Sequence, residues 1–134
     1  MLTFSEASNL AIHALAYLGA AGPGARLTAT DVARKLQRSE SHTAKVLNRL
    51  ATQGLLESSR GAAGGYWLKR DPAAISVREV IEAIDGPLHA PQCLLGQPIC
   101  DAKSCVFRNL FGPIWNEIAD HLSSTKLSSF NIKV

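Results

Sequence analysis

The chain has 134 residues, of which 46% are hydrophobic and 19% are charged, and its formal net charge is +3. This length suits one globular domain, and the composition excludes disordered and collagen-like proteins. No apolar run reaches the roughly 18 residues that a membrane span needs, and the apolar N-terminal run lacks the preceding Lys or Arg of a signal peptide. We therefore expect a cytoplasmic protein with no membrane partner, whose thiols stay reduced.

Positive charge is concentrated in the middle of the chain. Nine basic residues stand against three acidic ones between Arg26 and Arg70, so this segment has a net charge of +6, whereas the rest of the chain sums to −3. Such a pattern fits a face that binds a polyanion. It fits a solvated helix surface about equally well, so charge alone leaves both interpretations open.

The first predicted element is a helix over residues 5–21. Apolar residues recur there at the spacing of one helical face, from Ala7 to Leu18, and a run of Gly and Pro residues that starts at Gly19 ends the helix. A second stripe on the flank of this helix consists of Glu6, Asn9, His13 and Tyr17.

A second and a third helix follow. Thr28 is a suitable N-cap, and Thr28 with Asp31 resembles a capping box for a helix that ends near Gln37. Ser39 can cap a third helix, which Gly54 would end as a C′ residue. The residues expected to face inward on the third helix are Ala44, Leu47, Leu50 and Ala51. Two helices of these lengths joined by a few residues fit a helix-turn-helix.

A glycine-rich hairpin is predicted next. Residues 55–59 predict one strand, residues 66–68 predict the returning strand, and the glycine-rich segment 60–65 predicts the turn between them. A helix-turn-helix followed by such a hairpin is a winged helix.

In a winged helix, the early residues of the third helix reach base edges in the major groove. The residues in position for this role are Ser39, Ser41, His42 and Lys45. Arg60 suits an adjacent minor groove, with Gly61 and Tyr66 as further wing residues. Arg34, Arg38 and Arg49 are assigned to phosphate contacts. For any one of these residues, an exposed position without DNA contact is about as good an interpretation.

Two more helices are predicted in the second half of the chain. Ser76 and Glu79 form a capping box for a fourth helix, which Gly86-Pro87 ends. Gly112-Pro113 falls inside a later, longer apolar pattern, so we expect a kink or a fresh helix start there. The pattern consists of Phe107, Leu110, Phe111, Ile114, Ile118 and Leu122, which is more apolar surface than one small domain readily covers.

All three cysteines lie between these two helices, at Cys93, Cys100 and Cys105, separated by six and then four residues. An odd number of thiols in a reducing compartment favours a metal or redox site over disulfides. The spacing lacks the two close pairs that are usual in structural zinc sites. From the residues alone, a metal cluster, a zinc or thiol-redox switch, and no ligand at all remain open.

An ordered set of motifs resembles a known family. The motifs are Lys45–Leu50, Gly54-Leu55-Leu56, Ser59-Arg60-Gly61, Gly64-Gly65-Tyr66, Leu68, the helix from Ile75-Ser76-Val77 to Ile84-Asp85-Gly86, the three cysteines and the long last helix. Across essentially the whole chain, this set resembles the IscR/NsrR-type (Rrf2) family of bacterial transcriptional regulators. The resemblance implies a mostly α fold with a small β-hairpin wing. It implies a winged helix-turn-helix domain at residues 1–86, a cysteine-bearing loop at 87–105, and a long dimerisation helix with a tail at 106–134.

The resemblance also implies an iron-sulfur cluster, 2Fe-2S or 4Fe-4S, held by Cys93, Cys100 and Cys105. Three thiolates leave one coordination position, which in this family is filled from the first helix of the partner chain or from a histidine three residues past the last cysteine. That later position is Arg108 here, which cannot bind iron. We therefore favour His13 of the partner subunit. The remaining candidates are His89, Asp101 and His121.

Together these expectations predict a homodimeric regulator, not an enzyme. It would bind a roughly palindromic operator in double-stranded DNA, with an affinity switched by a cluster that responds to redox, nitric oxide or iron status. The nearer alternative is a winged-helix regulator with a thiol-redox or zinc switch, or with no cofactor. The distant alternative is a small cysteine-based oxidoreductase, but the sequence has no Cys-x-x-Cys pair, phosphate-binding glycine loop or nucleophile-base pattern.

Overall fold

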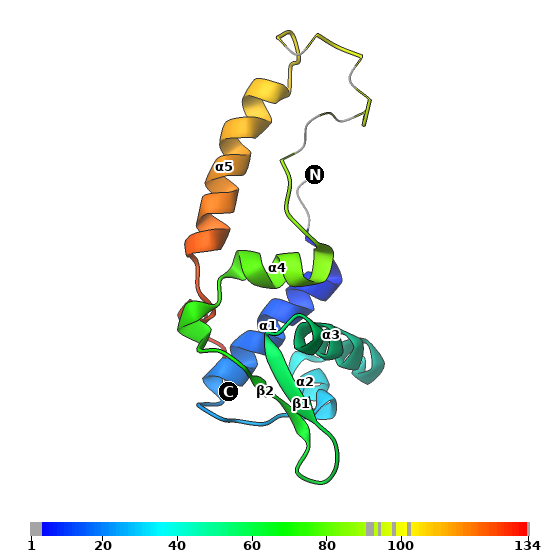
Figure 1. The fold of residues 1–134 in the computed structure, drawn as a ribbon, viewed down its shortest axis with the longest axis vertical. Helices are drawn as coiled ribbons and strands as arrows, with labels where there is room; N and C mark the ends of the chain where they lie inside the picture. The colour runs from blue at the N-terminus through cyan, green and yellow to red at the C-terminus, as the bar shows by residue number, and fades with distance from the viewer. Residues whose placement is uncertain (1–3, 91–92, 94, 98, 102, 134) are drawn as a thin grey trace.

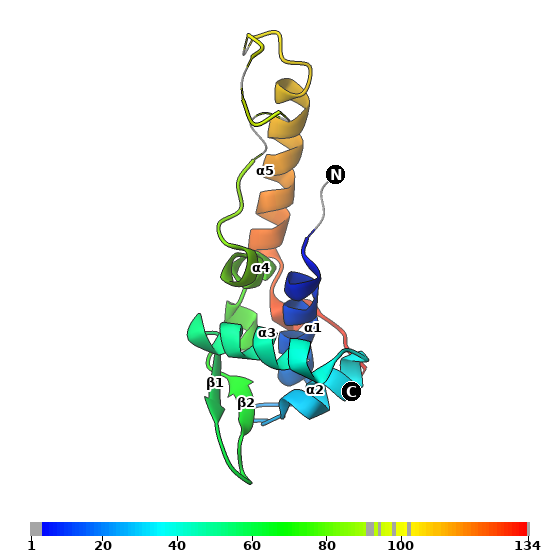
Figure 2. The same cartoon turned by 90° about the vertical axis from the view of Figure 1, so that its right-hand side faces the viewer.

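The computed structural model describes residues 4–90, 93, 95–97, 99–101 and 103–133. The chain begins with three helices, and a two-stranded hairpin follows them. The elements in chain order are α1 (Glu6–Ala20), α2 (Ala29–Leu36), α3 (Glu40–Thr52), β1 (Leu56–Ser59), β2 (Gly65–Leu68), η1 (Pro72–Ala74), α4 (Val77–Asp85), α5 (Arg108–Ser124) and η2 (Leu127–Ser129). In Figures 1 and 2, α5 projects from a body formed by the other elements, and the segment between α4 and α5 lies at the end remote from the hairpin. The predicted mostly α fold with a hairpin wing is confirmed.

Hydrogen bonds at the helix N-termini show how local sequence sets the helix starts. Thr28 Oγ1 accepts from the Asp31 N–H at 3.1 Å and the Asp31 carboxylate accepts from the Thr28 N–H at 2.9 Å, so the predicted capping box at α2 is complete. Ser76 caps α4 by accepting from the Glu79 N–H at 3.1 Å. The predicted box at α4 is only half formed, because the Glu79 carboxylate pairs with Arg70.

The hairpin is attached to the body at its base. Strands β1 and β2 pair antiparallel, with Leu56 opposite Leu68. A separate bridge joins Leu27 to Tyr66, in which the Tyr66 N–H donates to the Leu27 carbonyl at 2.8 Å and the Leu27 N–H donates back at 3.1 Å. Gly65 permits this close approach, because its φ is +136° and a Cβ would lie 2.9 Å from the Leu27 carbonyl oxygen.

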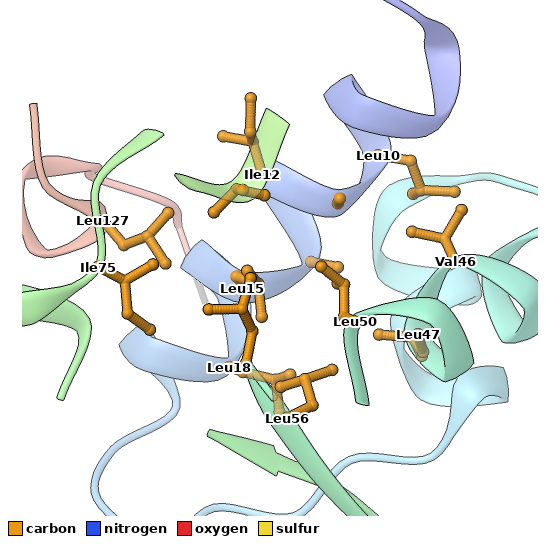
Figure 3. Packing of buried hydrophobic residues seen from close by; sticks show 14 of the residues in the cluster. Leu10, Ile12, Leu15, Leu18, Val46, Leu47, Leu50, Leu56, Ile75 and Leu127 are labelled. Carbon is orange, nitrogen blue, oxygen red and sulfur yellow. The ribbon is translucent and has the colours of Figure 1, made fainter. Parts of the chain in front are cut away.

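Helix α1 forms the centre of the hydrophobic core. Figure 3 shows Leu15 and Leu18 of α1 beside apolar side chains from α3, β1 and the segment that precedes α4. The largest fully buried apolar side chains are Leu15, Leu18, Leu47, Leu50, Leu56, Ile75, Ile81, Leu127, Val32 and Val80. Burial of one such leucine stabilises the fold by about 2 kcal/mol. The core therefore holds α3 firmly against α1.

The buried face of α3 differs in part from the prediction. Leu47 and Leu50 are buried as predicted. Ala44 and Ala51 are only half-buried, and the predicted set omits the buried residues Thr43 and Val46. Successive side chains point about 100° apart around a helix, so apolar periodicity locates a face without fixing its centre.

Residues that follow α5 return to the body. The Val77 N–H donates to the Thr125 carbonyl at 2.9 Å, and the Leu127 N–H donates to the Ile75 carbonyl at 3.0 Å. The Leu127 side chain is only 2% exposed and belongs to the core. The tail thus completes the packing of the winged helix, a contact that was not predicted from the sequence.

Helix α5 continues through Pro113, so of the two predicted outcomes a fresh helix start does not occur, and a kink there stays a prediction. The proline lies in the second turn, where it removes one backbone hydrogen bond, and the helix tolerates this loss. Leu122 packs against the core, whereas Phe107, Leu110 and Ile114 are 44%, 52% and 40% exposed. We call these three side chains the apolar strip. Among the described residues, no helix is both long and apolar enough to cross a membrane.

Candidate nucleic-acid interface and metal centre

The N-terminal turn of α3 presents polar side chains to solvent. Ser39 caps the helix by accepting from the His42 N–H at 3.2 Å, and Ser41 and Lys45 are exposed. The His42 ring is half-buried, and its Nε2 atom is buried with no hydrogen-bond partner among the described residues. That nitrogen is therefore not presented to a DNA base. Three of the four predicted base-reading residues, Ser39, Ser41 and Lys45, are thus exposed within the first two turns of α3.

The arginines predicted to contact phosphates fall into two groups. Arg34 and Arg38 are exposed, and Arg38 lies 3.9 Å from Glu6 in an open ion pair that is worth less than about 1 kcal/mol. Both guanidinium groups remain accessible to a phosphate. Arg49 Nε donates instead to the Ala83 carbonyl of α4 at 3.2 Å. Arg49 therefore connects α3 to α4, and its phosphate contact stays a prediction.

The wing carries the remaining predicted DNA-binding residues. Arg60 and Gly61 are exposed at the turn, where Gly61 has a φ of 98°. Tyr66 is half-buried, and its hydroxyl donates to Asn48 Oδ1 on α3. Burial raises the pKa of the Tyr66 hydroxyl, so it stays protonated and able to donate. Asn48 was not among the predicted site residues.

The three cysteines are free thiols on the segment between α4 and α5. Cys93 and Cys105 are half-buried, Cys100 is exposed, and Cys93 Sγ lies 3.5 Å from the Gln97 carbonyl oxygen. Within the described residues, no group of three or more His, Cys, Asp or Glu side chains is arranged to hold a metal ion. The thiol donors suit iron. The single chain does not, however, bring them together into a finished site.

His13 is exposed on α1, and its Nδ1 lies 2.7 Å from the Asn9 carbonyl oxygen. A carbonyl oxygen only accepts, so Nδ1 carries the proton and the neutral ring keeps its lone pair on Nε2. Metal-binding histidines are usually oriented by such a hydrogen bond from the other ring nitrogen. The other predicted candidates, His89, Asp101 and His121, are also exposed.

Helix α4 anchors the start of the cysteine-bearing segment. Glu82 Oε1 accepts from the Leu88 N–H at 3.0 Å and from Arg78 Nε at 3.1 Å. The Leu88 donor is the largest cause of a pKa of Glu82 below its ordinary value, and Arg78 lowers it further. This carboxylate was not predicted to have a role, since its hydrogen-bonding partners become visible only in the fold.

Replacing Glu82 by glutamine is expected to remove part of the pH dependence of stability. Because the folded-state pKa of Glu82 is lowered, its ionised form stabilises the fold above the unfolded-state pKa, and this contribution is lost as pH falls through the folded-state value. The wild type should exceed the variant in free energy of unfolding by about 1 kcal/mol near pH 6. Urea unfolding at a series of pH values down to about 3 should show this difference disappear.

Asp120→Asn provides the control for that series. The Asp120 side chain is exposed on α5 and makes no hydrogen bond or ion pair in the described part of the chain. It should leave the pH profile unchanged. A stability difference for Glu82→Gln that stays constant from pH 6 to pH 3 would contradict the assignment.

Comparison with known proteins decides the family. Residues 4–131 match the family model of Rrf2, described as an iron-dependent transcriptional regulator. The chain belongs to the Rrf2 family. This Rrf2 chain is 33% identical over 94 residues to the HTH-type transcriptional regulator IscR of Yersinia pestis and 32% identical over 93 residues to IscR of Escherichia coli. The matches cover 70% and 69% of the chain and 55% of each relative, so the chain spans about half the length of the curated relatives it matches.

Solved structures share the fold along nearly the whole Rrf2 chain. CymR, described as the global cysteine regulator of B. subtilis, is 25% identical with a TM-score of 0.82, over 96% of this chain and 95% of that chain. T. potens IscR is 23% identical with a TM-score of 0.75, over 95% of this chain and 84% of that chain. The oxidized form of Staphylococcus aureus CymR is 18% identical with a TM-score of 0.77, over 98% and 100%. The chain thus shares the fold of these winged-helix regulators along nearly its whole length.

Proposed function

We propose that this Rrf2 protein is a homodimer that binds a specific operator, with an affinity that depends on the state of a site at Cys93, Cys100 and Cys105. One observation carries the proposal: the hairpin wing lies at one end of the molecule, and the segment that holds all three cysteines lies at the other (Figures 1 and 2). The surface proposed to contact DNA and the segment proposed to sense the signal therefore lie apart in the molecule, and α4 and α5 connect them.

The proposed reading surface combines α3 with the wing. Ser39, Ser41 and Lys45 reach base edges in the major groove, where hydroxyl and ammonium groups can distinguish base pairs. Arg60 enters the adjacent minor groove, whose negative potential attracts a guanidinium group. Exposed basic side chains such as Arg34 neutralise phosphates and set the register on the duplex.

The proposed dimer interface is on α5. Its apolar strip is exposed, and no residue of this helix is fully buried in the single chain. An exposed contiguous apolar surface of this kind marks an interaction site. A two-fold dimer would place two α3 helices in successive major grooves, about 34 Å apart, so the operator would be roughly palindromic.

The proposed cofactor is an iron-sulfur cluster held by the three thiols, with His13 of the partner subunit as the fourth ligand. When bound, such a cluster supplies iron centres that are sensitive to oxidants, nitric oxide and iron supply. The Asn9 carbonyl supports the histidine, because it leaves Nε2 free to bind a metal. The described residues of the single chain do not arrange these thiols as a metal site, so the proposal requires the three thiols to come together when the cluster binds.

Helix α4 provides the proposed route from the cysteine segment to α3. Leu88, near the start of the segment, is hydrogen-bonded to Glu82, and Arg49 of α3 donates to the neighbouring Ala83 carbonyl. At the end of α4, Asp85 accepts from the hydroxyls of Ser5, the N-cap of α1, and Ser8 of α1, at 2.6 Å each. A rearrangement of the segment would therefore act on α4 and, through it, on the placement of α3.

Operator binding should fall steeply with salt if the exposed arginines contact phosphates. With an operator selected from a random duplex library, Arg34→Ala is expected to reduce the slope of log affinity against log salt by about 1.

Lys45→Ala is expected to relax base preference at one position at a cost of about 1–3 kcal/mol. Fluorescence anisotropy over a salt series, with matched and mismatched duplexes, measures both effects.

Lys103→Ala is the matched control, since Lys103 is an exposed cation that lies outside α3 and the wing. It should leave the slope and the base preference unchanged. Failure of the wild-type protein to select any duplex sequence would refute the proposed function.

A thiol switch without metal is the second candidate. It is favoured by the exposure of Cys100, whose free thiol is accessible to an oxidant. Anaerobic purification separates the two: a cluster gives visible absorption with matching iron and sulfide contents, whereas a thiol switch is colourless and changes operator affinity on oxidation alone.

A further inference from the structure

The hydroxyl of Tyr66 joins the wing to the recognition helix. It donates to Asn48 Oδ1, which belongs to the exposed side of α3, one turn beyond Lys45. Tyr66 belongs to β2, the strand that leads away from the wing turn. Of the side-chain hydrogen bonds and ion pairs that the described residues make, only this one joins α3 directly to the hairpin.

The backbone around Tyr66 holds its ring in one place. Its N–H and carbonyl both pair with Leu27, at 2.8 and 3.1 Å. Gly65 allows this approach, since any Cβ there would meet the Leu27 carbonyl. The Tyr66 ring packs against the hydrophobic core. The hydroxyl is therefore delivered to α3 from a strand that is fixed on its other side.

The opposite face of the hairpin is held separately. Successive residues of a strand point to opposite faces, so Trp67 faces away from Tyr66. The Arg26 guanidinium lies 4.1 Å from the centre of the Trp67 ring, and its Nη1 donates to the Ala63 carbonyl in the wing turn at 3.2 Å. Trp67 Nε1 donates to Glu57 Oε2 at 3.0 Å. These contacts stiffen the wing, and none of them involves a residue of α3.

We propose that Asn48 and Tyr66 are positioning residues that set the spacing between the recognition helix and the wing. Without this hydrogen bond the wing stays folded, because its strand pairing and the Arg26 contacts persist. Its tip would then be held relative to α3 only indirectly, through the Leu27 bridge and the core packing at the base of the hairpin. Lys45 in the major groove and Arg60 in the minor groove would then be engaged together less often. The inference rests on the proposed DNA-binding function and gives Tyr66 an indirect role in it.

Tyr66→Phe tests the proposal with the smallest change, since it removes one oxygen atom and keeps the ring. It is expected to lower operator affinity about three- to tenfold, the effect of losing one hydrogen bond that positions two contacts. Asn48→Ala should have a similar effect, and the double variant should be no weaker than either single one. Arg60→Ala should cost less affinity in the Tyr66→Phe background than in the wild type.

Hydroxyl-radical footprinting gives a readout that altered folding stability would not move. In Tyr66→Phe, protection from hydroxyl radicals along the minor groove next to the wing should decrease, while protection of guanine N7 from dimethyl sulfate in the major groove under α3 should persist. Tyr17→Phe is the matched control, because Tyr17 is a half-buried tyrosine of α1 whose hydroxyl has no hydrogen bond among the described residues. It should change neither affinity nor footprint.

Two results would overturn the inference while leaving the proposed function intact. One is additivity of Asn48→Ala and Tyr66→Phe, which would mean that Asn48 contacts DNA on its own. The other is operator binding by Tyr66→Phe that equals the wild type at a temperature well below unfolding. Absence of specific binding by the wild type itself would refute the proposed function instead.

Discussion

A protein that carries Leu110→Glu and Ile114→Glu is expected to be a folded monomer that has lost operator binding. Both side chains are exposed in the single chain, at 52% and 40%, so charge at these positions costs the isolated fold little. In a dimer paired along α5, the same positions would bury unpaired carboxylates in an apolar contact. This burial weakens the free energy of dimerisation by on the order of several kcal/mol, which is enough to prevent association at micromolar concentrations.

Loss of the dimer removes the second half-site from each binding event. Operator affinity should therefore fall at least about a hundredfold, because avidity between two linked sites contributes about 10²–10⁴. Sedimentation velocity would measure the change in mass, and anisotropy with the selected operator would measure the change in affinity. Far-ultraviolet circular dichroism should be nearly unchanged.

Asn116→Glu is the control for this experiment, because Asn116 is exposed on the side of α5 away from the apolar strip. It adds one negative charge to the same helix, against two in the double variant, and should leave a dimer that binds DNA. A double variant that remains dimeric, or a monomer with wild-type affinity, would contradict the proposed role of α5.

Replacing Cys93, Cys100 and Cys105 together by alanine is expected to abolish iron binding and uncouple operator affinity from the signal. All three thiols are free and lie outside the core, so the substitutions should not disturb the fold. After anaerobic purification, iron and sulfide should fall to background and the visible absorption should vanish. Operator affinity should differ from that of the loaded wild type by about 5- to 150-fold, the usual range of coupling between two sites.

Single histidine variants separate the fourth ligand from the other candidates. His13→Ala should alter the visible spectrum and shorten the lifetime of the cluster in air, while His121→Ala, its matched control, should do neither. A triple-cysteine variant that still holds iron, or that binds DNA like the loaded wild type, would contradict the proposed sensing site. A colourless wild type whose affinity responds to oxidation would identify the thiol switch.

Local sequence signals predicted most of the secondary structure. The Thr28 capping box, the Ser39 and Ser76 caps and the glycine-rich turn all appear where they were expected. Such signals depend on residues three or four positions apart, so no tertiary information is needed to recognise them. The order of these elements also predicted the winged helix and the family.

Roles that depend on distant partners were not predictable in the same way. The phosphate contact assigned to Arg49 from its exposed position stays a prediction, and the sequence did not show that Arg49 also donates to the Ala83 carbonyl 34 positions along the chain. Likewise, Glu79 had the spacing of a capping-box partner and pairs with Arg70. A long charged side chain can satisfy several partners, and packing between elements selects one of them.

By itself, the sequence determined the helices, the hairpin, the family and the grouping of all three cysteines on one segment, because each of these is encoded in neighbouring residues or in their order. The tertiary structure alone decided three further features. The tail returns to bury Leu127 in the core, α4 joins the cysteine segment to α3 through Glu82 and Arg49, and Tyr66 meets Asn48. Each of these contacts joins residues that come together only when the core closes around α1.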